Sequence, residues 1–224
     1  MGWARPAGTH QDPARVAPRL VLATHNRGKL AELHAILSEQ PGLSLPDGAV
    51  VSAADLATPE PVEDGVTFAA NALIKARALV AATGLPAVAD DSGLAVDVLG
   101  GAPGIFSARW AGRHGDDVAN LELLLAQLAD VGPEHRAAGF VCAAALVTPD
   151  GTEVVWEGAL RGVLLDAPAG EGGFGYDPIL RPDGETRSCA QLSPAEKNAI
   201  SHRGQAFRAL APHVAVALAA GAPA

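Results

Sequence analysis

The sequence predicts an α/β fold with a mixed β-sheet, and three features indicate this class. Residues 19–24 (RLVLAT) form an apolar strand that leads into leucines at helical spacing, which is a strand-loop-helix unit. Further along the chain, predicted strands interleave with predicted helices, and no internal repeat interrupts them. Residues 139–158 predict a hairpin around Pro149, Asp150 and Gly151, which adds antiparallel strands to the sheet.

The chain is expected to begin its fold after a leader. Residues 1–18 mix proline, glycine and polar residues without a period and predict a flexible leader, so the domain is expected at 19–221. The first helix is expected after Asn26, a residue type that caps helix N-termini. Residues 67–84 predict a second helix that ends at Gly84.

The remaining elements follow in order. PAVAD (86–90) and LAVDVL (94–99) predict two strands, with a tight turn at DDSG (90–93) between them. Residues 116–131 predict a helix with four leucines on one face. A capping-box pattern predicts one final helix over 193–220.

Charge and hydropathy exclude several functional classes. The 224 residues carry 16 Lys and Arg against 25 Asp and Glu, so the net charge of −9 opposes binding to nucleic acids and anionic membranes. A polyanionic ligand would need a local basic pocket. No apolar run reaches the length of a membrane span, and Cys142 and Cys189 form no disulfide or zinc pattern. The sequence predicts a soluble cytoplasmic protein.

The loop THNRGK (24–29) is the first candidate for ligand binding. It lies where backbone amides and the positive end of the following helix can hold an anion. It is not a Walker A loop, because Ala23 and Leu30 break that pattern. Thr24, Asn26 and Lys29 could form a triphosphate cradle. The alternative is an ordinary capped helix with a surface lysine.

Two consecutive carboxylates form the second candidate. Asp90 and Asp91 are expected at the C-terminal end of an apolar strand, a common location for ligands in α/β sheets. Neighbouring side chains on an extended backbone point oppositely, so one acid could face Mg²⁺ or water while the other fixes the turn. The alternative is that both are turn residues. Asp97, on the following predicted strand, could be another acid of the site, but we expect it to face solvent.

The loop GEGGFGYDP (170–178) formally matches G-x-G-x-x-G, but no helix can follow it, which excludes a dinucleotide site. Phe174 and Tyr176 stand among glycines that let a flat ligand approach the backbone, so a heteroaromatic base could stack there. The alternative is an aromatic pair that closes an edge of the core.

The segment SPAEKNAISHRG (193–204) gathers basic residues. Lys197 and Ser201 have the spacing of one helix face, and His202 and Arg203 follow. This cluster could be the basic pocket that the net charge requires. The alternative is a solvated helix face.

Together these segments resemble the inosine triphosphate pyrophosphatase family. The resemblance rests on four blocks in family order, from about Arg19 to the final helix: LATHNRGK, VADDSGLAVDVLGGAPGIFSAR, GGFGYDP and AEKNAISHRG. It implies an elongated two-lobed fold around a mixed twisted sheet, a nucleotide cleft between the lobes and a homodimer. It also implies Mg²⁺-dependent hydrolysis of non-standard purine nucleoside triphosphates (dITP, ITP and XTP) to the monophosphate and pyrophosphate.

The resemblance further implies roles for single residues. Asp91 would accept the proton and bind metal, with Asp90 as a supporting ligand. If the acid that the family carries near Asn71 also holds metal, that task falls to Glu63 or Asp64 in this chain, or the metal is bound more weakly. The residues that would contact the nucleotide are Thr24, His25, Asn26, Arg27, Gly28, Lys29, Ser92, Phe174, Gly175, Tyr176, Asp177, Lys197, His202 and Arg203.

The sequence departs from the family pattern in two ways, and two other functions remain open. Ala69 and Ala70 stand where the family commonly has an acid, and Phe106 stands where a tyrosine is common. We expect activity to survive both changes. The alternatives are a nucleotide-binding regulatory module that does not hydrolyse, and a pyrophosphatase for other modified nucleotides.

Overall fold

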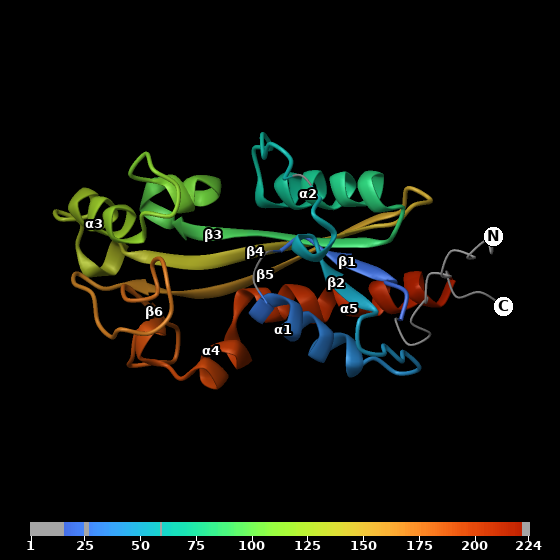
Figure 1. Ribbon diagram of the computed structural model, residues 1–224. Helices are drawn as coiled ribbons and strands as arrows, with labels where there is room; N and C mark the ends of the chain where they lie inside the picture. Colours follow the sequence, from blue (N-terminus) through green and yellow to red (C-terminus); the bar gives the residue numbers. More distant parts are fainter. Residues whose placement is uncertain (1–15, 25–26, 59, 221–224) are drawn as a thin grey trace, which may run out of the picture.

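A computed structural model describes residues 16–24, 27–58 and 60–220. It is an elongated α/β molecule built on one mixed six-stranded sheet, with strand order β2-β1-β3-β4-β5-β6 (Figure 1). The strands are β1 (Leu20–Leu22), β2 (Val50–Ser52), β3 (Ala87–Val96), β4 (Ala137–Val147), β5 (Glu153–Leu164) and β6 (Leu180–Pro182). The pairs β2-β1 and β1-β3 are parallel, and the others are antiparallel. The predicted fold class is confirmed.

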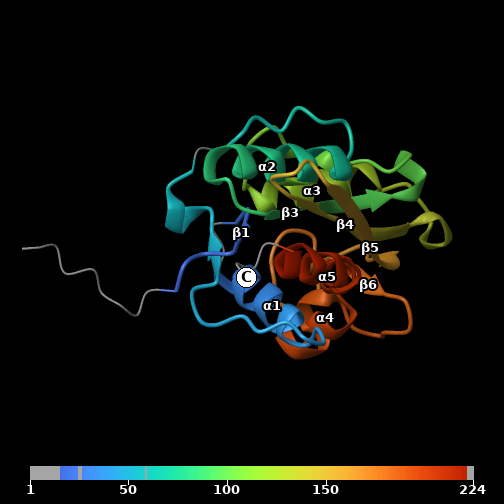
Figure 2. The same ribbon diagram turned by 90° about the vertical axis from the view of Figure 1, so that its right-hand side faces the viewer.

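Helices cover both faces of the sheet. They are α1 (Arg27–Ser38), α2 (Phe68–Thr83), α3 (Asp117–Gln127), α4 (Pro194–Ile200) and α5 (His202–Ala220). Helix α2 lies over one face, while α1 and α5 lie over the other (Figures 1 and 2). Helix α3, β6 and α4 gather at one end of the long strands. No described helix is long and apolar enough to cross a membrane.

The alternation of side chains along β3 and β4 separates the cores. Ala143 and Ala145 pack with Ala72 of α2, whereas Cys142 and Ala144 belong to the core under α1 and α5. A further core at the far end joins α3, β6 and the ends of β3 to β5. The long strands therefore connect two groups of helices, which agrees with the two lobes expected.

Local signals explain the elements that were predicted. Thr67 accepts a hydrogen bond from the Ala70 amide at the start of α2, and Gly84 ends that helix in a left-handed conformation. The predicted hairpin is also confirmed, because β4 and β5 pair along their length. In the turn, the Asp150 carboxylate accepts a hydrogen bond from the Thr152 amide.

The prediction of two strands separated by a DDSG turn was wrong. Residues 87–96 form one continuous strand, and each of its ten residues pairs with β4. The polar residues are tolerated in mid-strand because β1 pairs only with Ala87 and Val88, which leaves the edge beyond them without a neighbouring strand. Asp97 lies in a 3₁₀ turn (97–99) instead of a strand, and it is exposed as expected.

The prediction of a single final helix over 193–220 was also wrong. The chain is extended at Ser201 (φ −62°, ψ 141°), which separates α4 from α5. The Ser201 hydroxyl accepts a hydrogen bond from the Gly204 amide at 3.0 Å and so caps α5. Strands β2 and β6 were not predicted, since three residues each are too few to show a period.

Candidate active site

Asp91 lies at the centre of a polar cluster on the α2 face of the sheet. Asn71 Nδ2 of α2 donates to Asp91 Oδ2 at 3.1 Å, and Lys75 Nζ lies 3.4 Å from Asp91 Oδ1. Lys75 Nζ also lies 3.2 Å from Glu63 Oε2, in the loop before α2. The structure thus brings the predicted residues Asp91 and Glu63 to one ammonium group.

Burial and charge pairing have opposite effects on the pKa of Asp91 in this cluster. Burial raises the pKa of Asp91 above its usual range, and the nearby Glu63 carboxylate raises it further. The Lys75 ammonium and the Asn71 amide oppose both effects by stabilising the ionised form. A carboxylate held in this balance can bind a cation or accept a proton from water.

Asp90 points to the opposite face of the sheet. Its side chain is almost fully buried, and its Oδ2 lies 3.3 Å from Nε of Arg203 at the start of α5. The prediction that the two acids have different environments is confirmed. Asp90 nevertheless lines the same hollow as Asp91 and Glu63, so its role as a supporting metal ligand stays a prediction.

The edge of β3 between the two faces is open to a ligand. The Leu94 amide donates to Ser107 Oγ at 2.9 Å, and the Val96 amide donates to the Ala102 carbonyl at 3.0 Å, both away from β4. Because amide directions repeat every second residue in a strand, the Ser92 amide also faces this edge. Ser92 therefore presents a backbone donor at this edge, directly after Asp91.

A hollow of about 130 Å³ on the α5 side contains most of the predicted base-binding residues. Phe174 is 65% exposed there, and Lys197 Nζ lies 5.0 Å from the centre of its ring. Lys197 also forms a close ion pair with the buried Asp177, whose Oδ2 accepts the Phe174 amide at 2.8 Å. The hollow joins an aromatic face, a cation and a buried acid, which are the groups that a polar heteroaromatic ring can engage.

Helices α4 and α5 each bring predicted residues to this hollow. Lys197 comes from α4 and Arg203 from the first turn of α5. His202 lines the hollow too, and its ring stacks on Phe140 with centroids 5.2 Å apart. The predicted pairing of Lys197 with Ser201 on one helix face was wrong, because Ser201 caps the next helix instead.

The glycine-rich loop is attached to the opposite wall by two hydrogen bonds. The Gly175 amide donates to Asp117 Oδ2 at 2.9 Å, and the Tyr176 hydroxyl donates to the Ser107 carbonyl at 2.9 Å. Tyr176 is buried, and burial raises the pKa of its hydroxyl, which therefore stays protonated as a donor. Of the two predicted aromatic residues, only Phe174 offers an open ring face.

The predicted phosphate loop is described in part. Thr24 is buried after β1, while His25 and Asn26 lie outside the described residues. Arg27, Gly28 and Lys29 begin α1. The phosphate contacts of this loop stay predictions.

A second hollow on the α2 side contains the Asp91 cluster. Its lining includes Glu63, Lys75, Asp91 and Arg109, and it shares Ser92 and Ala108 with the hollow that holds Phe174. The two hollows therefore meet at Ser92. A ligand that spans them would place one end at Lys197 and the other at Asp91.

A family model described as the Ham1 family matches residues 20–213. The chain belongs to the Ham1 family.

Named relatives agree with this Ham1 assignment. This chain is 68% identical to a Streptomyces coelicolor protein named dITP/XTP pyrophosphatase. The match spans 196 residues and covers 88% of this chain and 96% of the relative. A crystal structure of a nucleoside-triphosphatase / dITP/XTP pyrophosphatase from Mycobacterium abscessus is 53% identical, with a TM-score of 0.72, and covers 87% of this chain and 99% of its own. The structure of a HAM1 protein from Coxiella burnetii is 38% identical, with a TM-score of 0.80. The match covers 88% of this chain and 98% of the Coxiella chain.

The donor groups of this Ham1 site fit a magnesium ion whose remaining ligands come from the substrate and water. Glu63 and Asp91 supply two carboxylates within reach of one ammonium group. Mg²⁺ in nucleotide enzymes is commonly held by one or two carboxylates together with substrate phosphates and water. Residues 16–24, 27–58 and 60–220 contain no cluster of three or more ligating side chains, so a closed cage made by protein alone is not present there.

The sequence analysis missed three residues of the Ham1 site. Asn71 and Lys75 reach Asp91, and Asp117 fixes the loop at Gly175. Asn71 and Lys75 could have been found, because they are polar residues one turn apart on a mostly apolar helix. Asp117 offered no such signal, since an acid in the first turn of a helix is an ordinary cap residue.

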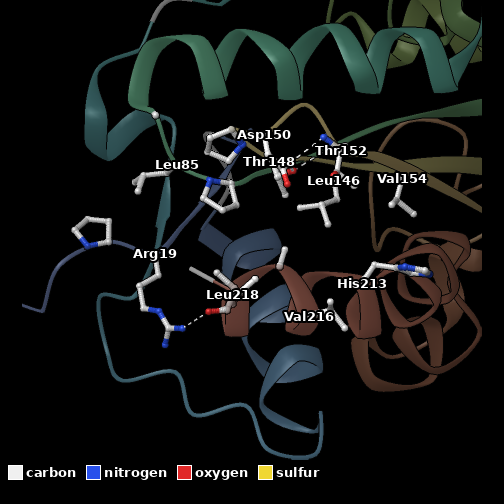
Figure 3. Close-up of a pocket in the computed structure, with 16 residues that line it drawn as sticks. Arg19, Leu85, Leu146, Thr148, Asp150, Thr152, Val154, His213, Val216 and Leu218 are labelled. Carbon is white, nitrogen blue, oxygen red and sulfur yellow. Dashed lines mark hydrogen bonds between the residues drawn. The ribbon is translucent and has the colours of Figure 1, made fainter. Parts of the chain in front are cut away.

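A third hollow of about 610 Å³ lies at the other end of the Ham1 molecule, between α5 and the β4-β5 turn (Figure 3). Arg19 reaches across it and donates to the Leu218 carbonyl at 2.7 Å. His213 and Val216 of α5 also line it. Its lining includes no residue of the predicted site, so it has no part in the arrangement around Ser92.

Proposed function

We propose that this Ham1 protein hydrolyses non-standard purine nucleoside triphosphates, dITP, ITP and XTP, to the monophosphate and pyrophosphate. The observation that carries the proposal is the meeting of two different hollows at Ser92, one with Phe174 and Lys197 and the other with Asp91 and Glu63. The names of the relatives support the same substrate class.

The hollow with Phe174 and Lys197 supplies base recognition. The purine stacks on Phe174, and the Lys197 ammonium donates to the 6-oxo group of hypoxanthine or xanthine. A 6-amino group at the same place would face a donor with a donor, and such a mismatch disfavours adenine nucleotides strongly. Asp177 keeps Lys197 in position through their ion pair.

The hollow with Asp91 carries the chemistry. Asp91 orients a water molecule and accepts its proton, and the water oxygen forms a new bond to the α-phosphorus. The bond from that phosphorus to the bridging oxygen breaks, and pyrophosphate leaves. Lys75 and the predicted phosphate contact Lys29 supply positive charge that stabilises the phosphate oxygens.

Magnesium completes this assignment. We propose that Glu63 and Asp91 hold Mg²⁺ together with the phosphates, which neutralises charge on the transferred group. Asp90 lines the same hollow and also pairs with Arg203, so we keep it as a supporting ligand. Ala69 and Ala70 stand where the family commonly has an acid, and of the two possible substitutes, Glu63 and Asp64, Glu63 lies beside Lys75 and lines the Asp91 hollow.

We further propose a cytoplasmic homodimer. The cytoplasmic location is supported by Cys142 and Cys189, which are buried and form no disulfide, as suits a reducing compartment. The dimer is supported by the family resemblance alone.

The test is pyrophosphate release by the full-length protein with Mg²⁺ and a panel of ITP, dITP, XTP, dUTP, GTP and ATP. We expect fast release from the first three, slow release from ATP and dUTP, which lack a purine 6-oxo group, and one pyrophosphate for each monophosphate formed. Binding of ITP without release would instead support the regulatory module. Equal turnover of ATP and ITP would overturn the proposed base recognition, and preference for dUTP would indicate another substrate class.

A further inference from the structure

Asn71 is a buried polar residue for which fold stability offers no account. It lies in the first half of α2 and is 2% exposed. Its Nδ2 donates to Asp91, but its Oδ1 is buried and has no hydrogen-bond partner among the described residues. Buried polar atoms are rarely left unpaired, because an unpaired atom destabilises the fold. A leucine or alanine at this position would avoid that cost.

The amide orientation explains why the carbonyl is left unpaired. An ionised carboxylate only accepts hydrogen bonds, so the NH₂ group of Asn71 must face Asp91 and Oδ1 must face away. Oδ1 then lies against Gly65, where an added Cβ would come within 2.5 Å of it. The loop that carries Glu63 thus packs directly on Asn71.

The hydrogen bond determines which oxygen of Asp91 is presented to the site. Rotation about the last bond of an aspartate side chain is soft, so a carboxylate without a fixed partner turns readily. In this structure Asn71 holds Oδ2 at 3.1 Å, which leaves Oδ1 on the side of Lys75 and Glu63. A neutral donor does this without cancelling the negative charge that the site needs.

We infer that Asn71 is a positioning residue that fixes the rotation of the Asp91 carboxylate for hydrolysis. This inference rests on the proposed function. Asn71 touches neither hollow directly, so its effect passes through Asp91. Its loss should therefore lower the rate of the chemical step and leave nucleotide binding intact.

The test compares Asn71→Leu with the wild-type protein in the full chain. We expect kcat for pyrophosphate release from ITP to fall about 10- to 100-fold, the usual effect of losing a group that orients a ligating side chain. KM for ITP, and the Kd of a non-hydrolysable ITP analogue measured by calorimetry with Mg²⁺, should stay at wild-type values. Tm should fall only slightly, because loss of the hydrogen bond to Asp91 is offset in part by removal of the unpaired carbonyl.

Asn120→Leu is the matched control. Asn120 is also a buried helix asparagine, 1% exposed: its Oδ1 accepts the Ala111 amide at 2.7 Å, and its Nδ2, like Asn71 Oδ1, is buried with no partner among the described residues, but it contacts no residue of the Asp91 cluster. We expect this variant to lower Tm and leave kcat unchanged. Unchanged kcat in Asn71→Leu, or an equal fall in both variants, would overturn the inference. If Asn71→Leu does not fold, Asn71→Ala is judged by the same criteria. Wild-type protein that releases no pyrophosphate would contradict the proposed function instead.

Discussion

Asp91 is the residue through which both binding and chemistry are proposed to act. Exchange of its carboxylate for an amide, Asp91→Asn, keeps the shape but removes the proton acceptor. We expect kcat for ITP to fall about 100- to 10,000-fold, the range for loss of a general base. The Kd of a non-hydrolysable ITP analogue should change much less, because base recognition depends on the other hollow. Steady-state kinetics and calorimetry measure the two quantities.

Asp97→Asn is the control for that variant. Asp97 is an exposed acid that pairs with Arg161 and lies outside both hollows. Its replacement should leave turnover at the wild-type value. If Asp91→Asn retained normal turnover, Asp91 would not be the proton acceptor.

Of the two residues Asp91 and Asn71, only Asp91 is predicted as a site residue from the sequence. Asp91 is predictable because two consecutive acids after an apolar segment are unusual. Asn71 lies 20 residues away, and its hydrogen bond to Asp91 exists only once α2 has packed on the sheet. Lys197 and Asp177 are likewise 20 residues apart and meet only in the fold.

At the scale of elements, β3 depends on close packing at Gly93. A Cβ at this position would lie 2.5 Å from the Gly104 carbonyl oxygen and closer still to Ser107 Oγ. Gly93→Ala should therefore destabilise the protein by about 1–3 kcal/mol, as overpacking of a core does. Urea unfolding followed by circular dichroism measures this. A variant as stable as wild type would show that the 104–109 segment does not pack so closely on β3.

Helix α4 depends on a charged cap that responds to pH. Glu196 accepts hydrogen bonds from Arg187 and from Ser193, which lowers its pKa from 4.5 to about 2. Because the folded pKa is the lower one, the stabilisation is complete above about pH 4.5 and is lost as the pH falls toward 2. We expect Glu196→Gln to lower Tm at pH 7 and to match wild type near pH 2.

Glu122→Gln is the control for this pH series. Glu122 is an exposed acid on α3, and the described part of the chain gives it no ion pair. It should leave Tm close to wild type at neutral pH. A Tm difference for Glu196→Gln that did not shrink on acidification would contradict the assigned charge pairing.

Long periodic elements were predictable and short or irregular ones were not. Helix α3 shows its buried face as leucines three and four apart, and Leu121, Leu124 and Leu128 are buried. The break at Ser201 has no helix-breaking residue to reveal it, and the turn-like composition of residues 90–93 hid a continuous strand. In both cases contacts made in the folded protein determine the backbone conformation, and the conformational preferences of the local residues do not.

For the whole molecule, metal should matter for activity and not for folding. Lys75 already pairs with both Glu63 and Asp91, so each carboxylate has a charged partner in the fold without a metal ion. Removal of Mg²⁺ with EDTA should therefore abolish pyrophosphate release and leave Tm unchanged. Differential scanning calorimetry and the release assay on the same sample check this. Unfolding by EDTA would assign the metal a structural role, and full activity in EDTA would exclude the proposed metal requirement.

The overall arrangement was predictable only through the family resemblance. Composition and periodicity indicate an α/β domain with an antiparallel ribbon, but they do not place α2 and α5 on opposite faces of β3. That placement puts Asp91 and Arg203 on different sides of one strand. It also makes Ser92, an inconspicuous residue in the sequence, the point where the two hollows meet.

The most direct measurement is a crystal structure of Asp91→Asn with ITP and Mg²⁺. The account predicts that hypoxanthine stacks on Phe174 with its 6-oxo group at Lys197, and that the triphosphate passes Ser92 so that the α-phosphate lies beside residue 91. A nucleotide bound in the hollow of Figure 3, or with base and phosphates on the same face of β3, would contradict it.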